Sequence, residues 1–385
     1  MNQGRLMKVV GTIVMVTILL GSITTGQVKA EASVYRFDFG EGNVAPGYIG
    51  VSSTERYSLT KGYGFNIPEH MKNIVSSGKG LHSDAVQFLS TGVKSKNTFN
   101  LDLPNGLYEI KVTLGDTARS SVAAEDVYQI MNMTGINPTD KFQLPITDGQ
   151  LNIIVTPGEE GKTYTLSSLE IIQISEDPIT NRTIYVGGDS TVSNYYPLMT
   201  SERGGWGQML FRYLKKDTFQ IRNMATAGQA SRGFLNDGQT EAIVKYIKPG
   251  DYFLLQLGIN DTHRNSTITR DEFKSNMRDI IQQVQAKGAT VILITPQGLA
   301  SDFNEDSIHY DESKYYRTTT LDLAFEENTV LVDLNWQSSA YFTSIGPNAT
   351  SSLFLADGLH PIREGAKQLA RIVVEDLRNQ GIDGF

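Results

Sequence analysis

The pattern of apolar and polar residues divides the chain into two parts. Between residues 33 and 175, apolar residues alternate with polar ones or form short runs, and no long helical period intervenes. Turn-forming sequences such as Pro104-Asn105-Gly106 and Asp148-Gly149 separate these runs. The runs that predict strands are residues 34–39, 98–103, 108–114, 151–156 and 166–174. Together they predict an antiparallel β-sandwich.

Beyond residue 181 the strand runs alternate with helical runs. The polar, proline-containing stretch at residues 176–181 suits a linker. The strand runs are residues 183–186, 219–224, 252–257, 290–295 and 329–334, and the helical runs are residues 207–216, 240–247, 270–287 and 312–327. A last amphipathic run follows Pro361. This alternation predicts a parallel sheet with helices on both faces, so residues 182–385 are expected to form an α/β domain.

Two segments at opposite ends of the α/β domain carry candidate chemistry. Ser190 follows the first strand, and the carboxyl edge of an open α/β sheet is where ligands bind, so Ser190 is a candidate nucleophile. On its own, this serine could equally cap the next helix. Asp357 precedes His360 by three residues on the turn into the last helix, where its carboxylate can accept a hydrogen bond from Nδ1 of the imidazole. We therefore predict a catalytic triad of Ser190, Asp357 and His360.

Two more loops are expected at the same edge of the sheet. Gly228 follows the second strand and Asn260 follows the third. The Ser190 and Gly228 backbone N–H groups and the Asn260 amide could together stabilise an oxyanion. The absence of Gly-x-Ser-x-Gly and His-Glu-x-x-His argues against an α/β-hydrolase elbow and a zinc protease, and we expect no metal or other cofactor. A glycosidase using Asp189 and Asp357 is disfavoured, because both carboxylates have better roles in a serine mechanism.

These segments together resemble the four blocks of the SGNH (GDSL-type) hydrolases. The resemblance rests on Gly-Asp-Ser at 188–190, the Gly228 loop, Gly-Ile-Asn-Asp at 258–261 and Asp-x-x-His at 357–360, in the family's order. It implies a flavodoxin-like three-layer fold and the residue roles given above. The third block departs from the expected Gly-His-Asn-Asp, which affects a neighbouring contact but leaves Asn260 in place.

Within that family the rhamnogalacturonan acetylesterase branch is most similar. The similarity rests on the turn at residues 204–207 and on the spacing from Asn223 to Arg232. It implies removal of acetyl groups from a pectic polysaccharide. The opening at residues 37–40 and the hairpin at 104–108 resemble galactose-binding-like sandwiches, which makes residues 33–175 an accessory domain.

Three residues near the motifs are candidate substrate contacts, each with a structural alternative. Arg232 could hold a galacturonate carboxylate or form a surface salt bridge. His263 could touch substrate from the rim or be a solvated loop residue. Trp206 could stack on a sugar ring, although an indole at such a turn is more often part of a core.

Residues 1–30 are typical of an export signal. They have a positive start at Arg5 and Lys8, an apolar core and the small-residue site Val28-Lys29-Ala30. Cleavage there predicts a secreted, extracellular protein without a membrane anchor; an uncleaved anchor is disfavoured because the apolar core is short and interrupted. The sequence has no cysteine, and its formal charge of −8 gives no broad attraction to nucleic acid. It does not specify an oligomeric state.

The sequence therefore predicts a secreted carbohydrate acetylesterase. One alternative is the same machinery acting on a lipid or aryl ester, for which a wide apolar acyl pocket is expected. A second alternative is a glycan-binding protein without activity, which the intact Ser190, Asn260, Asp357 and His360 argue against.

Overall fold

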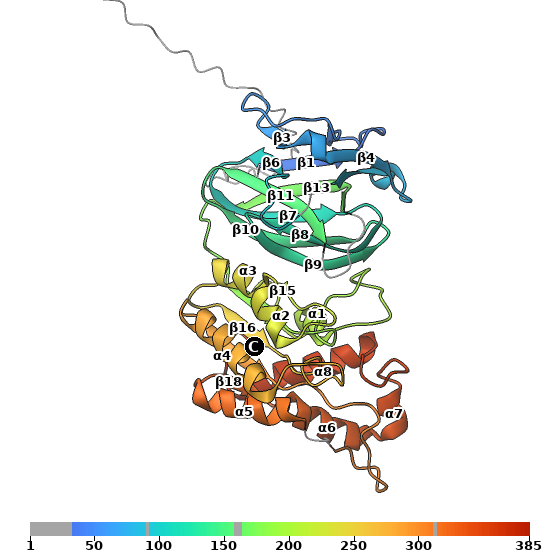
Figure 1. Cartoon of the computed structure of the whole chain (residues 1–385), viewed down its shortest axis with the longest axis vertical. Coiled ribbons are helices and arrows are strands. Elements are labelled where there is room, and N and C mark those ends of the chain that lie inside the picture. Colours follow the sequence, from blue (N-terminus) through green and yellow to red (C-terminus); the bar gives the residue numbers. More distant parts are fainter. Residues whose placement is uncertain (1–32, 90–91, 158–163, 311–313) are drawn as a thin grey trace, which may run out of the picture.

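The computed structural model describes residues 33–89, 92–157, 164–310 and 314–385. Figure 1 shows two bodies stacked end to end, an all-β body in blue to green and a mixed body of helices and strands in yellow to red. The predicted β-sandwich followed by an α/β domain is confirmed. The export signal predicted at residues 1–30 lies outside the described residues. Within the described residues, the helices are all too short or too polar to cross a membrane.

Three sheets build the β-sandwich. Its strands are β1 (Val34–Phe39), β2 (Ile49–Val51), β3 (Tyr63–Phe65), β4 (Met71–Val75), β5 (Asp84–Phe88), β6 (Phe99–Asp102), β7 (Gly106–Thr113), β8 (Thr117–Ala124), β9 (Val127–Gly135), β10 (Thr139–Ile146), β11 (Gln150–Pro157), β12 (Thr165–Leu166) and β13 (Ser168–Ser175), with short 3-10 helices at Pro68–His70 and Gly80–His82. The sheet orders are β10-β7-β13-β1-β2, β3-β6-β11-β8-β9 and β12-β5-β4. Strands β1 and β2 pair in parallel, whereas β1 with β13 and β7 with β10 are antiparallel.

Aromatic side chains fill the middle of the sandwich. Phe37 and Phe39 both point inward because residues two apart on a strand share a face. Their rings pack on Phe99 of β6 at centroid distances of 5.2 and 5.0 Å, mostly edge to face. Phe65 of β3 joins the same cluster. The alternation that predicted β1 therefore reflects this core.

Strands β8, β9 and β10 were not predicted from the sequence. Strand β8 reads TARSSVAA, whose small and polar residues show no apolar alternation. Strand β10 contains Pro145, which weakens a strand prediction. These three strands nevertheless lie nearest the α/β domain (Figure 1), so the contact with the second domain is made by strands that were not predicted. The short strands β2, β3, β4 and β5 were not predicted either.

The α/β domain has a parallel five-stranded sheet, as predicted. Its strands are β14 (Thr183–Gly187), β15 (Gln220–Asn223), β16 (Tyr252–Leu255), β17 (Thr290–Ile294) and β18 (Val330–Val332), in the order β15-β14-β16-β17-β18. All four strand pairs are parallel. Alternate residues of β17 face opposite cores, with Ile292 in one apolar cluster and Leu293 in the other. A sheet buried on both faces explains why these strands read as nearly continuous apolar runs.

Helices cover both faces of this sheet. They are α1 (Trp206–Met209), α2 (Ser231–Asn236), α3 (Gln239–Tyr246), α4 (Arg270–Gln285), α5 (Tyr315–Glu326), α6 (Leu334–Ile345), α7 (Pro347–Ser351) and α8 (Arg363–Asn379). Buried residues of α1, α6 and α8 share one apolar cluster, and those of α2 to α5 share the other. The helix predicted at 207–216 is instead the short α1 followed by a 3-10 turn at Leu210–Arg212. Helices α2, α6 and α7 were not predicted.

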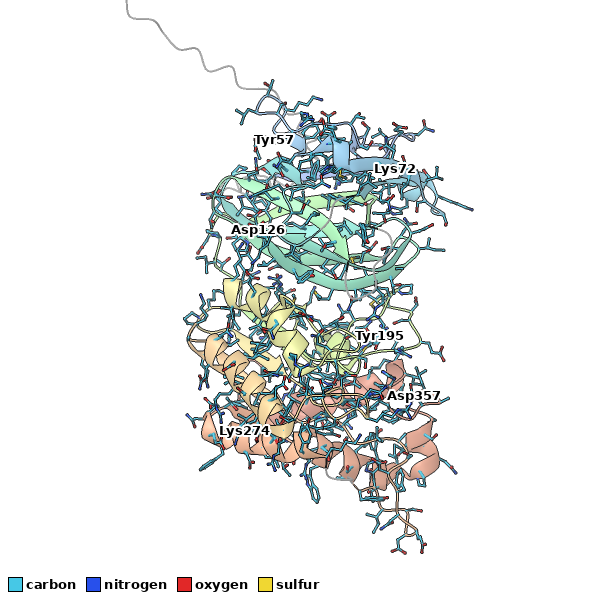
Figure 2. All side chains as sticks on the ribbon, viewed as in Figure 1. Tyr57, Lys72, Asp126, Tyr195, Lys274 and Asp357 are labelled. Atoms are coloured by element: carbon cyan, nitrogen blue, oxygen red, sulfur yellow. The ribbon has the colours of Figure 1, made fainter. Side chains whose placement is uncertain are left out.

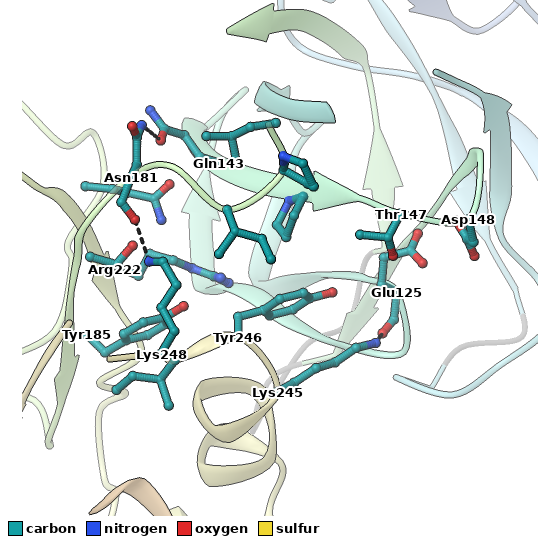
Figure 3. Close-up of a pocket in the computed structure, with 17 residues that line it drawn as sticks. Glu125, Gln143, Thr147, Asp148, Asn181, Tyr185, Arg222, Lys245, Tyr246 and Lys248 are labelled. Atoms are coloured by element: carbon teal, nitrogen blue, oxygen red, sulfur yellow. Dashed lines mark hydrogen bonds between the residues drawn. The ribbon is translucent and has the colours of Figure 1, made fainter. Parts of the chain in front are cut away.

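The two domains share apolar core as well as polar contacts. Val127 and Met131 of β9 are buried in the same cluster as helices α3 and α4. The guanidinium of Arg222 donates to Gln129 across the boundary. Beside this contact lies an interdomain pocket of about 540 Å³, in which Asn181 donates to Gln143 at 2.6 Å (Figure 3). The β-sandwich is therefore packed against the α/β domain and is more than a tethered module.

Candidate active site

The loop after β14 holds Ser190 at the carboxyl edge of the sheet. Gly188 is required there because a Cβ would lie 2.6 Å from Val192 and 2.9 Å from the Gln256 carbonyl oxygen. Two backbone N–H groups on this loop, from Val192 and Ser193, donate to the Asp189 carbonyl and fold the chain back on itself. Ser190 is left only 7% exposed, with its hydroxyl directed toward His360 on the turn before the last helix.

The structure brings Ser190, His360 and Asp357 together. Ser190 Oγ lies 2.8 Å from His360 Nε2, and His360 Nδ1 lies 2.7 Å from Asp357 Oδ2. The other Asp357 oxygen accepts the His360 and Leu359 backbone N–H groups at 2.9 and 3.0 Å. This second set of bonds fixes the carboxylate, which in turn orients the imidazole. The arrangement can transfer a proton from a serine hydroxyl to a histidine.

Hydrogen bonding keeps the Asp357 carboxylate ionised. Partial burial alone would raise its pKa, but the backbone and side-chain hydrogen bonds from His360, with the Leu359 N–H, lower the pKa to about 2. Asp357 is therefore charged at every pH at which the enzyme is expected to work. Figure 2 labels it with Tyr195 on the same flank of the α/β domain.

Trp206 lies behind the Ser190 loop, not on the surface. It is fully buried, and its Nε1 donates to Gln256 Oε1 at 2.8 Å. Gln256 donates to Thr191 Oγ1 at 2.7 Å, and Thr191 donates to Asp189 Oδ1 at 2.9 Å. The interpretation of Trp206 as a sugar-stacking residue is therefore wrong, and the alternative that it belongs to the core is the observed one. Its indole instead ends a chain of hydrogen bonds that supports the nucleophile loop.

Asp189 lies at the other end of this series of hydrogen bonds and is fully buried. Its negative charge should therefore lower the free energy of unfolding. Burial raises its pKa to about 6, although the Thr191 hydrogen bonds oppose the shift. Among the described residues, none donates a hydrogen bond to Oδ2 of this carboxylate. Because the folded-state pKa lies above the ordinary value of 3.8, the native state holds this proton more tightly than the unfolded chain.

We expect Asp189→Asn to change the pH dependence of stability. The wild-type protein should lose on the order of 3 kcal/mol as pH rises from about 4 to above 6, while the Asn variant has no such carboxylate. The amide oxygen can still accept both Thr191 hydrogen bonds. Denaturant unfolding of both proteins at pH 4 and pH 8 measures this difference. If the free energies of unfolding of the two proteins differ by the same amount at pH 4 and at pH 8, the assignment is contradicted.

The two other predicted loops meet the Ser190 loop. Backbone hydrogen bonds join Thr226 N–H to Gly188 O at 3.2 Å and Gln256 N–H to Gly187 O at 3.1 Å. Asn260 Nδ2 donates to Gln229 O at 2.9 Å, so the Asn260 and Gly228 loops are also tied to each other. Gly228 is exposed and has φ of 83°, a conformation that favours glycine. Residues far apart in sequence are thus assembled at the edge where an oxyanion hole was predicted.

Two residues that support these loops were not singled out from the sequence. Tyr195 donates through its hydroxyl to Ser190 O at 2.6 Å, and burial raises its pKa to about 12, so it remains a donor. Asp261 accepts the Ser231 N–H at 3.0 Å and thereby ties the Asn260 loop to the start of α2. Asp261 belongs to the Gly-Ile-Asn-Asp segment and could have been found there. Tyr195 carries no comparable sequence signal.

The other two candidate substrate contacts lie on the surface. Arg232 forms a bidentate salt bridge with Glu272, in which Nε donates to Oε1 at 2.6 Å and Nη2 donates to Oε2 at 2.9 Å. The salt-bridge alternative is therefore the observed one, and the guanidinium is engaged by α4. His263 is exposed on the loop after Asn260, and its Nδ1 accepts the Asn265 N–H at 3.3 Å. Its contact with substrate stays a prediction.

Comparison with known protein families identifies both parts of the chain. Residues 35–172 match the model for the galactose-binding-like domain of β-agarases and YXIM-type esterases. Residues 186–368 match the GDSL-like lipase/acylhydrolase family. Both matches agree with the resemblances noted in the sequence.

Individual relatives extend this agreement over the whole chain. An uncharacterized esterase from Bacillus subtilis, YxiM, is 59% identical over 97% of this chain and 98% of its own. A crystal structure of YxiM from the same organism superposes with a TM-score of 0.90, at 61% identity, over 92% of this chain and 100% of that chain. The probable rhamnogalacturonan acetylesterase YesY of Bacillus subtilis is 31% identical over 52% of this chain and 94% of its own.

Proposed function

Because the chain belongs to the GDSL-like lipase/acylhydrolase family and is a carboxylic ester hydrolase, we propose that it removes acetyl groups from pectic rhamnogalacturonan. The observation that carries this proposal is the 2.8 Å contact between Ser190 Oγ and His360 Nε2, with Asp357 behind the imidazole. The choice of substrate draws on the similarity to a probable rhamnogalacturonan acetylesterase.

The proposed reaction is a two-step acyl transfer. His360 Nε2 takes the Ser190 proton as Oγ attacks the acetyl carbonyl, and the imidazolium then protonates the departing sugar oxygen. Water, deprotonated by the same imidazole, attacks the acetyl-enzyme; the bond from the acyl carbon to Ser190 Oγ breaks, the imidazolium returns its proton to Oγ, and acetate leaves. In both steps the Ser190 and Gly228 N–H groups and the Asn260 amide hold the negative oxygen. Because the imidazole must be neutral to accept a proton, activity is expected to fall on acidification.

Asn260→Ala should lower kcat for ester hydrolysis by about 10²- to 10³-fold, because it removes one oxyanion donor. KM should change little, since the donor acts mainly in the transition state. Asn236→Ala is a matched control: that side-chain amide bonds to Arg232 O on α2, outside the site. Equal kcat values for Asn260→Ala and Asn236→Ala would contradict the role of Asn260.

The substrate is tested by acetate release from three esters in parallel. Acetylated rhamnogalacturonan, acetylated xylan and p-nitrophenyl acetate are offered to residues 31–385, with Ser190→Ala as the inactive control. Release from the pectic polymer at the highest kcat/KM supports the proposal. Preference for xylan, or for small esters alone, would refute the pectic assignment while leaving the ester hydrolase chemistry intact.

We also propose that the protein is exported and cleaved after Ala30. The support is the charged, apolar and small-residue order of residues 1–30. N-terminal sequencing of protein recovered from the culture medium should begin at Glu31. Retention of the whole protein in the cell or its membrane would contradict export.

A further inference from the structure

The β-sandwich contacts the two loops that surround the nucleophile. Asp140 of β10 accepts the Tyr196 hydroxyl at 2.6 Å and the Asn194 amide at 3.4 Å, and both residues lie on the loop that follows Ser190. Arg119 of β8 donates through Nη2 to Ala227 O at 3.2 Å, on the loop that carries Gly228. Each contact links a residue of the accessory domain to a loop that carries a proposed oxyanion donor.

The local backbone of β8 directs Arg119 out of the regular sheet. The pairing of β8 with β9 shifts register between Thr117 and Ser120, and Arg119 has φ of 54°. A bulge of this kind redirects a side chain, and bulges are common next to active sites. A non-glycine residue in the left-handed region is also uncommon, and such residues concentrate at functional sites.

Arg119 donates to the peptide group between Ala227 and Gly228, whose N–H is a proposed oxyanion donor. Gln229 N–H donates to Thr226 O at 3.3 Å, and Gly228 at the third position of this turn has φ of 83°. Ala227 is not among the residues with positive φ. These features define a type II turn, which differs from type I mainly by a flip of its central peptide.

That central peptide consists of the Ala227 carbonyl and the Gly228 N–H. Because glycine tolerates both signs of φ, the turn itself does not fix which way this N–H points. Among the described residues, none accepts a hydrogen bond from it. A guanidinium on the carbonyl side holds the peptide in one orientation and also polarises the N–H, since hydrogen bonds along a peptide group reinforce one another.

We propose that Arg119 is a positioning residue that sets the oxyanion hole from the β-sandwich, by holding the Ala227–Gly228 peptide with its N–H toward the reacting carbonyl. The proposal rests on the role of Gly228 in the proposed function. It assigns the accessory domain a part in catalysis that is independent of any sugar binding.

The test compares three full-length variants on p-nitrophenyl acetate, a substrate too small to need the polysaccharide site. Arg119→Ala removes the contact and leaves a non-glycine residue at the same φ. Arg119→Lys keeps a cation that can reach the carbonyl. Lys94→Ala is the matched control, because Lys94 pairs with Glu241 of α3 across the same domain boundary at 2.7 Å without touching the site.

Arg119→Ala is expected to lower kcat about tenfold, less than complete loss of a donor, with KM changed less than twofold. Arg119→Lys should recover part of this loss, and Lys94→Ala should retain wild-type kcat. The rate at which an organophosphonate labels Ser190 should fall in parallel with kcat, since that adduct also places an oxygen in the hole.

Three results would overturn the proposal. Arg119→Ala could match Lys94→Ala on the small ester, or it could lose activity only on acetylated polysaccharide through KM, which would make Arg119 a substrate contact. If Arg119→Ala proves unstable by thermal unfolding, Arg119→Met replaces it, because methionine keeps an apolar stem but has no donor for Ala227 O. A folded Arg119→Met with wild-type kcat and labelling rate would indicate a structural role only. Failure of the pectic substrate assignment would show instead in the wild-type protein, which would still hydrolyse p-nitrophenyl acetate.

Discussion

Ser190→Ala is expected to lower kcat for every ester tested by about 10⁴-fold or more, because it removes the oxygen that attacks the ester carbonyl. Among the residues that the structure describes, Ser190 Oγ makes one hydrogen bond, to His360 Nε2, so its loss removes little packing. Substrate binding should persist, which leaves KM or a measured Kd nearly unchanged. Initial rates with p-nitrophenyl acetate and acetate release from the polymer both measure this effect.

A serine distant from the site provides the control for this variant. Ser344 lies at the exposed end of α6, where its hydroxyl bonds to Tyr341 O. Ser344→Ala should keep full activity, and both variants should show the wild-type circular dichroism spectrum and Tm. Residual activity in Ser190→Ala above a few per cent of wild type would mean that another nucleophile carries the reaction.

Asp357→Asn is expected to lower kcat/KM by about 10³- to 10⁴-fold, because an amide can present the wrong partner to His360 Nδ1 and cannot stabilise the imidazolium. The pKa of Asp357 is lowered to about 2, despite partial burial, by the hydrogen bonds from His360 and Leu359. A depressed carboxylate pKa means that the charge is present above about pH 4 and lost only as pH falls toward 2. The deficit of the Asn variant should therefore be similar across pH 5 to 9.

The pH profile of kcat/KM for both proteins, with Asp383→Asn as control, measures this prediction. Asp383 is an exposed carboxylate paired with Arg182 at 2.7 Å, so its neutralisation changes charge by the same amount outside the site. A deficit that grows or disappears between pH 5 and 9 would show that Asp357 itself titrates in this range. Near-wild-type activity of Asp357→Asn would remove Asp357 from the triad.

The parts of this molecule that the sequence predicted are those fixed by short-range chemistry. A strand followed by two glycines places Ser190 at a sheet edge, and an Asp three residues before His360 on a turn is close enough to accept a hydrogen bond from the imidazole. The parallel sheet followed from long apolar runs, because strands buried on both faces need apolar residues at nearly every position.

The residues for which the sequence left two alternatives depend on partners far away in the chain. Arg232 and Glu272 are 40 positions apart, and Trp206 and Gln256 are 50 apart. A tryptophan at a glycine-rich turn looks the same in sequence whether it faces solvent or a buried amide. Arg119 was missed for a further reason: its strand shows no apolar alternation, and its contact exists only once two domains have docked.

The shared apolar cluster at the domain boundary limits how freely this architecture can be rearranged. YesY is matched over 94% of its length by only 52% of this chain, so a hydrolase of this family can be built at roughly half the size. Here, however, Val127 and Met131 of the sandwich are buried among the helices of the α/β domain. Cutting the chain at the linker would expose that apolar surface and withdraw Asp140 and Arg119 from the catalytic loops. The two domains are distinct in the sequence but share a core in the structure, so replacing the sandwich with a different domain would require redesign of the α/β surface on which it packs.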